Sequence, residues 1–118
     1  MGMTEVALKV KNLRYPSKVF EGIFLVDSGA AFTVVPESIL KKIGIKPQHK
    51  ETFSLADGRL IERKVGSALY EFEGKEAAAP ILFGEKDDSL LLGTFTLEAL
   101  GLTLDPFKRK LYKAILRM

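Results

Sequence analysis

Asp27 interrupts a stretch of sequence that is otherwise apolar, and it restricts the fold more than any other residue of the 118-residue chain. The run Ile23-Phe24-Leu25-Val26 precedes it, and the run from Phe32 to Val35 is again apolar and β-branched. This pattern predicts two buried strands joined by a short polar turn. A lone buried carboxylate is costly unless it is paired or hydrogen-bonded. The fold must therefore give Asp27 polar partners, and the neighbouring Ser28 and Gly29 supply compact polar groups, N–H donors and a tight turn.

Short strands separated by turns account for most of the chain. We expect strands over residues 4–10, 18–26, 32–35, 52–55, 60–65, 67–72, 77–83, 90–92, 102–104 and 110–115, and short helices over 36–43 and 95–100. Turn signals recur about every eight to twelve residues, a spacing typical of barrels and sandwiches. The chain contains no linker, low-complexity segment or tandem repeat, so residues 1–118 are expected to form one domain.

The dipeptide Asp57-Gly58 lies between two strand-like runs, Thr52–Leu55 and Leu60–Val65. Asp-Gly is a strong hairpin signal, because both turn residues can take positive φ. We therefore expect a β-hairpin whose tip is Ala56-Asp57-Gly58-Arg59.

The composition argues against several kinds of site. The chain has no cysteine and one histidine, His49. Disulfides and thiolate metal sites are therefore excluded, a zinc site is not expected, and a Ser-His-Asp or Cys-His mechanism has no support. The glycines form no phosphate-cradling motif. We expect neither a metal nor another cofactor.

The net charge of +3 owes much to basic residues near the C-terminus, namely Lys108, Arg109, Lys110, Lys113 and Arg117. A basic tail can bind nucleic acid, but a solvated, lysine-rich edge strand is the favoured interpretation because no basic stripe interleaved with aromatic residues is present. No apolar run approaches the about 20 residues of a membrane span, and no signal peptide is recognised. The lack of cysteine suits a reducing compartment, so we expect a cytoplasmic protein.

The segment Phe24-Leu25-Val26-Asp27-Ser28-Gly29-Ala30 resembles the signature of aspartic proteases, in particular of the single-domain, retroviral-type (retropepsin-like) family. Leu91-Leu92-Gly93 and the helix expected after it resemble that family's second element. Leu55-Ala56-Asp57-Gly58-Arg59 resembles the tip of its flap hairpin, although viral relatives have a glycine-rich tip in place of this charged one. Together these segments follow the family's order over residues 18 to 105.

This resemblance implies a mostly β fold, a closed acid-protease-type β-barrel with one or two short helices and half an active site per chain. Hydrolysis in this family uses two facing carboxylates, which share a proton and activate one water. Because the chain contains a single such motif, the resemblance implies a homodimer in which Asp27 meets its symmetry mate. The expected substrate is a peptide or an unfolded protein.

The resemblance also implies a role for each site residue. Asp27 is the expected acid/base residue. Ser28 is expected to form hydrogen bonds across the dimer axis, Gly29 to offer backbone atoms, and Ala30 to let the two loops pack closely. The expected flap, which would cover an extended peptide, comprises Leu55, Ala56, Asp57, Gly58 and Arg59.

Other interpretations stay open at this point. The chain can instead be a catalytically weak or inactive protease-like module for dimerisation or peptide binding, or, less favoured, a basic nucleic-acid-associated domain. Val34 and Ile81 are candidates for pocket walls, but core packing is favoured for both. The dimer contact is expected in the segment from Leu111 to Met118 in preference to the N-terminal strand.

Overall fold

Short β-strands form most of the protein. The computed structural model describes residues 3–105 and 107–115, and within them the chain forms nine strands and two short helices. The strands are β1 (Glu5–Lys11), β2 (Val19–Val26), β3 (Thr33–Pro36), β4 (His49–Ser54), β5 (Leu60–Phe72), β6 (Lys75–Gly84), β7 (Leu91–Leu92), β8 (Leu102–Asp105) and β9 (Lys110–Lys113), and the helices are α1 (Glu37–Lys42) and α2 (Thr94–Ala99). The prediction of a mostly β fold with two short helices is confirmed.

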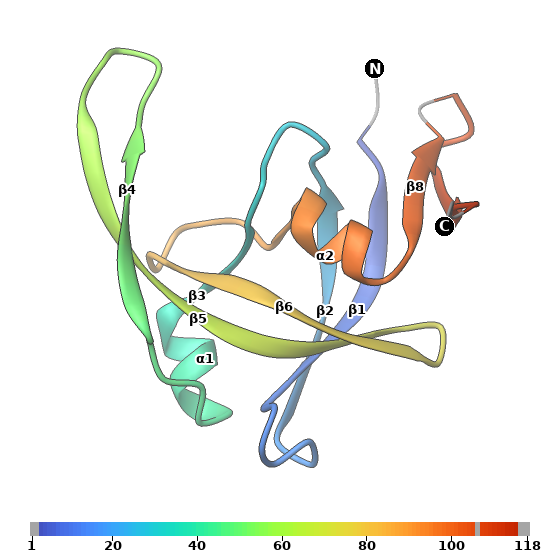
Figure 1. Ribbon diagram of the computed structural model, residues 1–118, viewed down its shortest axis with the longest axis horizontal. Helices are drawn as coiled ribbons and strands as arrows, with labels where there is room; N and C mark the ends of the chain where they lie inside the picture. Colours follow the sequence, from blue (N-terminus) through green and yellow to red (C-terminus); the bar gives the residue numbers. More distant parts are fainter. Residues whose placement is uncertain (1–2, 106, 116–118) are drawn as a thin grey trace.

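Seven strands form one curved sheet in the order β1-β2-β7-β3-β6-β5-β4 (Figure 1). Strand β7 lies between β2 and β3, parallel to β2 and antiparallel to β3. Strand β1 pairs with β5 as well as with β2, and Val10 lies opposite Tyr70 in that second pairing. The strands before and after Asp27 are therefore both held by β7.

The core lies against this curved sheet, and both helices contribute to it. Along β1, Leu8 and Val10 are buried while Lys9 between them is not, as the alternation of side chains in a strand requires. Leu40 of α1 and Leu97 of α2 are also buried. The other largest fully buried apolar side chains are Tyr70, Phe24, Ile81, Leu92, Leu100, Val35 and Val65.

Both helices lie within one residue of the expected ranges, and a glycine with positive φ comes after each of them. Pro36 is the N-cap residue of α1, and Gly44, with φ of 76°, follows its C-cap residue Ile43. Helix α2 is followed by Gly101, with φ of 68°. A left-handed residue after a helix favours glycine, because a side chain is strained there.

The predicted boundaries around β5 are wrong. The two strands expected over 60–65 and 67–72 form one strand, and β4 begins at His49, three residues before the strand expected over 52–55. Gly66 pairs with Ile81 inside β5, and a Cβ atom at this glycine would lie 2.9 Å from the carbonyl oxygen of Lys46. Glycine therefore allows a neighbouring backbone to approach the strand here and does not interrupt it.

The C-terminal strands β8 and β9 form a separate two-stranded sheet, with Leu104 opposite Leu111. The strand predicted to reach Ile115 ends at Lys113. Residues 116–118 of the expected dimer segment lie outside the described residues. In the described part of the chain no helix is long and apolar enough to cross a membrane.

Candidate active-site cleft

The loop that carries Asp27 is fixed by backbone hydrogen bonds to β7 and to the first turn of α2. The Asp27 N–H donates to the carbonyl oxygen of Leu92 at 3.0 Å. Further along, Thr94 N–H donates to Ala30 at 2.8 Å and Phe95 N–H donates to Ala31 at 3.0 Å. Three bonds from one neighbouring segment hold the loop in place, so its shape depends on contacts about 65 residues away in sequence.

Gly93 lies directly against this loop. A Cβ atom at Gly93 would be 2.5 Å from the carbonyl oxygen of Phe32, so any larger residue requires the backbone to move. The N–H group of Gly93 donates to the hydroxyl of Thr33 at 3.0 Å, inside the core. The absence of a side chain at Gly93 therefore lets the two segments meet closely.

Tyr70 lies in the core on β5. Burial raises the pKa of its phenol well above the usual range, so the group stays protonated. Its hydroxyl donates to the carbonyl oxygen of Pro80 on the neighbouring strand β6, at 3.0 Å. The phenol is therefore a satisfied core group and not an available acid.

The Asp27 carboxylate is half-buried at the start of the loop. Its Oδ1 atom accepts the N–H of Gly29 at 2.9 Å, and within residues 3–105 and 107–115 it has no other hydrogen bond. Ser28 and Gly29 are exposed, and Ala30 is half-buried. One carboxylate with an N–H donor beside it and a second oxygen unbonded is an arrangement that can bind a water or a further polar group.

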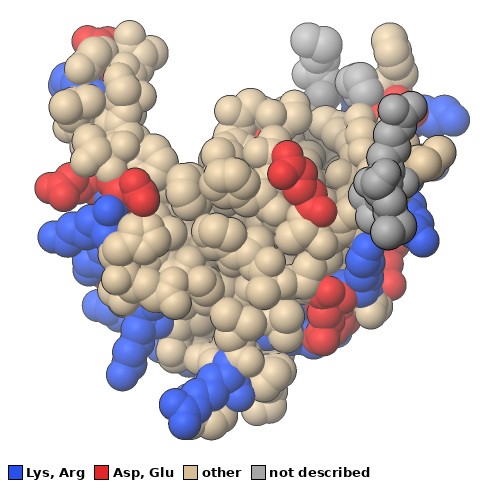
Figure 2. Space-filling view, viewed as in Figure 1, with Lys and Arg blue, Asp and Glu red and all other residues tan. Residues whose placement is uncertain are grey.

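A cleft of about 1000 Å³ separates this loop from an arm formed by β4 and the first half of β5. Figure 2 shows the hollow beside the projecting arm, and the surface around it is mostly uncharged. The residues that line the cleft are Leu25, Gly29, Ala30, Ala31, Phe32, Val34, Phe53, Ser54, Leu55, Arg59, Ile61, Arg63, Leu82, Asp87, Asp88, Ser89 and Leu91.

The structure brings together four of the predicted site residues around the cleft, namely Gly29, Ala30, Leu55 and Arg59. Ala56, Asp57 and Gly58 form the exposed tip of the arm. Ser28 lines a different hollow, of about 300 Å³, together with residues of α2 and β8. The loop and the arm are thus two walls of one cleft, and Ser28 faces away from it.

The tip of the arm differs from the predicted turn, because only Gly58 has positive φ, at 86°. The N–H of Gly58 donates to Leu55 at 2.9 Å, and the N–H of Leu55 donates to Arg59 at 2.8 Å. The Asp57 carboxylate accepts the backbone N–H of Arg59 at 3.0 Å and its Nε at 2.7 Å. The first of these contacts holds the pKa of Asp57 below its usual range, and the charged side chain of Arg59 adds to the effect.

Sequence reasoning missed several residues of the cleft wall. Phe32 and Phe53 line it from the loop and from the arm, and Asp87 and Asp88 line it from the segment between β6 and β7. The alternation of β4 and the position of Phe32 beside the motif were the available signals for the two aromatic residues. Among the described residues no group of three or more His, Cys, Asp or Glu side chains could hold a metal ion.

Of the two candidate pocket walls, Val34 lines the cleft. Ile81 is completely buried and belongs to the core, as the favoured interpretation holds.

Comparison with known proteins agrees with this geometry. Residues 19–94 match a family described as aspartyl protease. Twenty-seven chains of solved structures are similar to the protein. One is the solution structure of the simian foamy virus (mac) protease, with a TM-score of 0.57 and 20% sequence identity over 80% of this chain and 91% of the viral one. No curated protein matches the chain.

The viral protease shares the fold at low sequence identity. The family match covers well over half of the chain and includes the Asp27 loop, the arm and β7. The chain therefore belongs to the aspartyl protease family, with the retropepsin-like fold.

Proposed function

We propose that the protein is a homodimeric aspartic endopeptidase in which Asp27 of each of two copies contributes one catalytic carboxylate. The observation that carries this proposal is the position of Asp27. Its carboxylate is half-buried in a loop held by backbone hydrogen bonds, one of its oxygens has no partner among the described residues, and Gly29 to Phe32 of the same loop line a cleft of about 1000 Å³. Hydrolysis by this route needs two carboxylates, and the loop supplies one.

The chemistry follows from placing two such carboxylates side by side. Like charges a few ångströms apart raise the pKa of one group, so the pair holds a single proton in mild acid. The ionised carboxylate then takes a proton from a water molecule, and the protonated one donates to the carbonyl oxygen of the scissile bond. Asp27 and its symmetry mate perform these two roles, and no metal is required.

The surroundings of Ser28 support the dimer. Its side chain is exposed, and within the described part of the chain its hydroxyl has no hydrogen-bond partner. A two-fold axis beside this loop would bring each Ser28 hydroxyl to the other copy, as the retropepsin resemblance implies. The segment from Leu111 onward, in which Tyr112 and Ile115 are exposed, is the proposed second contact.

The substrate is a peptide or an unfolded polypeptide in extended conformation. Strand β4 is the edge of the sheet, and it borders the cleft through Phe53 and Ser54. Extended chains add to such edges by backbone hydrogen bonding. The arm, with Leu55 to Arg59 at its tip, serves as the flap that covers the bound chain.

Three broader expectations belong to the same proposal. We treat residues 1–118 as one retropepsin-like domain, and the pairing of β1 with β5 supports a closed barrel. A cytoplasmic location stays a prediction from the sequence.

The decisive experiment mixes wild-type protein with the Asp27→Asn variant. Cleavage of fluorescein-labelled casein is measured from mild acid to neutral pH. The variant alone should be inactive, and in excess it should suppress wild-type activity, because mixed dimers contain one carboxylate. The control is Glu73→Gln, which changes one charge in the exposed β5–β6 turn and should not suppress activity.

Each alternative has its own outcome in this experiment. Cleavage by the variant alone would remove Asp27 from the mechanism. A wild-type protein that dimerises but cleaves nothing at any pH would instead be a dimerisation or peptide-binding module. Failure of the excess variant to suppress activity would argue against a shared site.

A further inference from the structure

The β4–β5 arm projects from the body of the protein (Figure 1). Near its base, Arg63 pairs with Glu85 at 3.0 Å and Lys64 pairs with Glu37 at 2.8 Å. These ion pairs are partly exposed to solvent, and such pairs contribute little to rigidity. In the described structure no hydrogen bond or ion pair joins residues 54–60 to anything outside the arm.

An aromatic contact holds the side of the arm that faces the cleft. The rings of Phe53, on β4, and Phe32, in the loop after Asp27, meet edge to face, with their centroids 5.6 Å apart. Phe32 also meets Phe95 of α2 edge to face at 5.2 Å. Both Phe32 and Phe53 are half-buried, and both line the cleft.

We propose that Phe32 is a positioning residue, which sets the position of the arm over the cleft through its contact with Phe53. Phe95 supports Phe32 from the side of the helix. Beyond this contact, residues 54–60 have no described hydrogen bond or ion pair with the body, so a small displacement at the contact is amplified at the tip. This inference rests on the proposed function in one respect, which is that the position of the arm affects the binding of substrate in the cleft.

The geometry predicts a particular kinetic effect. Without the aromatic contact, the arm samples open positions more often, and the apparent affinity falls with the fraction of closed molecules. An edge-to-face pair has a strength that corresponds to roughly a 2- to 10-fold change in an equilibrium. The KM for labelled casein should rise by that factor, while kcat stays within about twofold, because the hydrogen bonds that hold the Asp27 loop come from backbone groups and not from either phenylalanine side chain.

The variants are Phe32→Ala, Phe53→Ala and the double substitution. The double variant should be no worse than either single one, because both remove the same contact. Phe53→Tyr keeps the ring and should have the wild-type KM. Phe53→Leu keeps most of the apolar volume and replaces the alanine variant if that variant does not fold. Its KM should lie between those of the wild type and Phe53→Ala. Thr52→Ala is the matched control, since Thr52 is the exposed neighbour on β4 and belongs to the opposite face of the strand.

A second readout does not depend on turnover. Amide hydrogen exchange of residues 54–60 is measured in an Asp27→Asn background, and Phe32→Ala and Phe53→Ala should accelerate it relative to Thr52→Ala. If Phe32→Ala, Phe53→Ala and Thr52→Ala have equal exchange rates over residues 54–60 and equal KM values, the inference is overturned. If wild-type protein cleaves nothing, the proposed function fails, but the exchange experiment still decides whether Phe32 positions the arm.

Discussion

The hydroxyl groups of Thr33 and Thr96 lie 2.6 Å apart in the core, where β3 begins beside helix α2. Both residues are fully buried, and Thr33 also accepts the N–H of Gly93. The pair thus joins the end of the Asp27 loop to the segment that supports it. Because buried polar groups are costly when unpaired, this contact fixes the relative position of the two segments.

Replacement of Thr33 by valine should destabilise the protein although the shape of the side chain is kept. The change leaves the Gly93 N–H without its acceptor in the core and breaks the contact between the two threonine hydroxyls. Unsatisfied buried groups cost about 1–3 kcal/mol each, so the free energy of unfolding should fall by at least about 1 kcal/mol. Urea denaturation measures this value for the wild type and the variant.

The matched control for this change is Thr52→Val, at an exposed position of β4. Its effect should stay within about 0.5 kcal/mol. The effects of Thr33→Val and Thr96→Val should be less than additive, because both changes break the same contact between the two hydroxyls. Equal stabilities of the Thr33→Val and Thr52→Val proteins would contradict the assigned role of the buried pair.

Ser28→Ala should weaken the proposed dimer without unfolding the monomer. The exposed hydroxyl has no partner within the described residues, so its loss costs the monomer little. If each copy donates one hydrogen bond across the axis, two bonds are lost, and the dissociation constant should rise roughly 10-fold or more. The dependence of specific activity on protein concentration, together with sedimentation, measures the shift.

Ser28→Thr provides the comparison, because it keeps the hydroxyl group. It should retain a dissociation constant close to that of the wild type. If the alanine and threonine variants dimerise equally well, the Ser28 hydroxyl does not act across the interface.

The sequence predicted the parts of this protein that depend on local pattern. The strand before Asp27 and the two short helices follow from local pattern, and the structure places each within one residue of its expected range. Gly66 was misjudged because its role is to admit the backbone of Lys46, which lies 20 positions earlier in the sequence. No local signal reports such a contact.

The candidate site likewise has features that the sequence predicted and contacts that it could not predict. The motif identified Asp27 and its neighbours, and the hairpin signal identified the arm. The contact between Phe32 and Phe53 arises only when the arm folds back over the cleft, so alternation alone could not reveal it. The buried hydroxyl pair of Thr33 and Thr96 likewise joins residues 63 positions apart.

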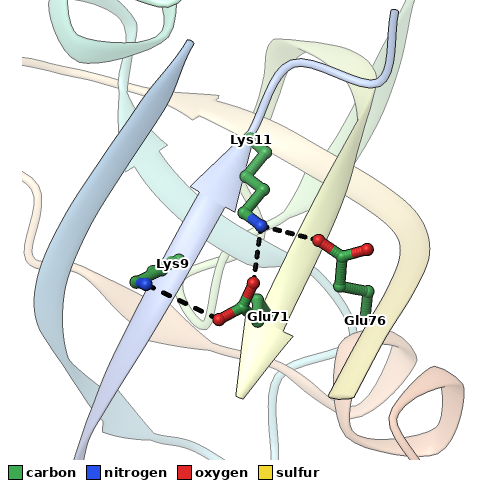
Figure 3. A network of polar contacts seen from close by, with 4 residues as sticks. All are labelled: Lys9, Lys11, Glu71 and Glu76. Carbon is green, nitrogen blue, oxygen red and sulfur yellow. Dashed lines mark hydrogen bonds and ion pairs between the residues drawn. The ribbon is translucent and has the colours of Figure 1, made fainter. Parts of the chain in front are cut away.

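An ion-pair network on the sheet surface predicts how stability depends on pH (Figure 3). The Nζ atom of Lys11 contacts carboxylate oxygens of Glu71 at 2.5 Å and Glu76 at 2.6 Å, and Lys9 lies 3.6 Å from Glu71. These contacts lower the pKa of Glu71, chiefly through the hydrogen bond from Lys11, and raise that of Lys11. The network joins β1, β5 and β6.

The directions of these two pKa shifts determine how stability changes with pH. Stability from Glu71 is fully present above its ordinary pKa of 4.5 and is lost as the pH falls through the lowered pKa. Stability from Lys11 is present below 10.5 and is lost as the pH rises through the raised pKa. Thermal melting of Glu71→Gln should therefore vary less with pH in the acid range than melting of the wild type.

Added salt should reduce the difference between these two proteins, because charges that are partly exposed are partly screened. The control is Glu73→Gln, whose carboxylate is exposed in the β5–β6 turn and forms no ion pair with any described residue. Parallel melting curves for the wild type and Glu71→Gln across the acid range would show that the network adds nothing.

The tip of the arm should stay ordered in the mild acid in which a pair of carboxylates shares a proton. The pKa of Asp57 is held below its ordinary value of 3.8, mainly by the backbone N–H of Arg59. Its contribution to the order of the tip is therefore present above pH 3.8 and is lost only as the pH falls through the lowered pKa.

Two variants test the role of Asp57. Asp57→Asn keeps an oxygen that accepts the Arg59 N–H, whereas Asp57→Ala removes it. The Arg59 amide should exchange roughly 2- to 10-fold faster in the alanine variant than in the asparagine variant. Equal exchange rates at Arg59 would show that the tip is held by its backbone turn alone and that Asp57 does not order it.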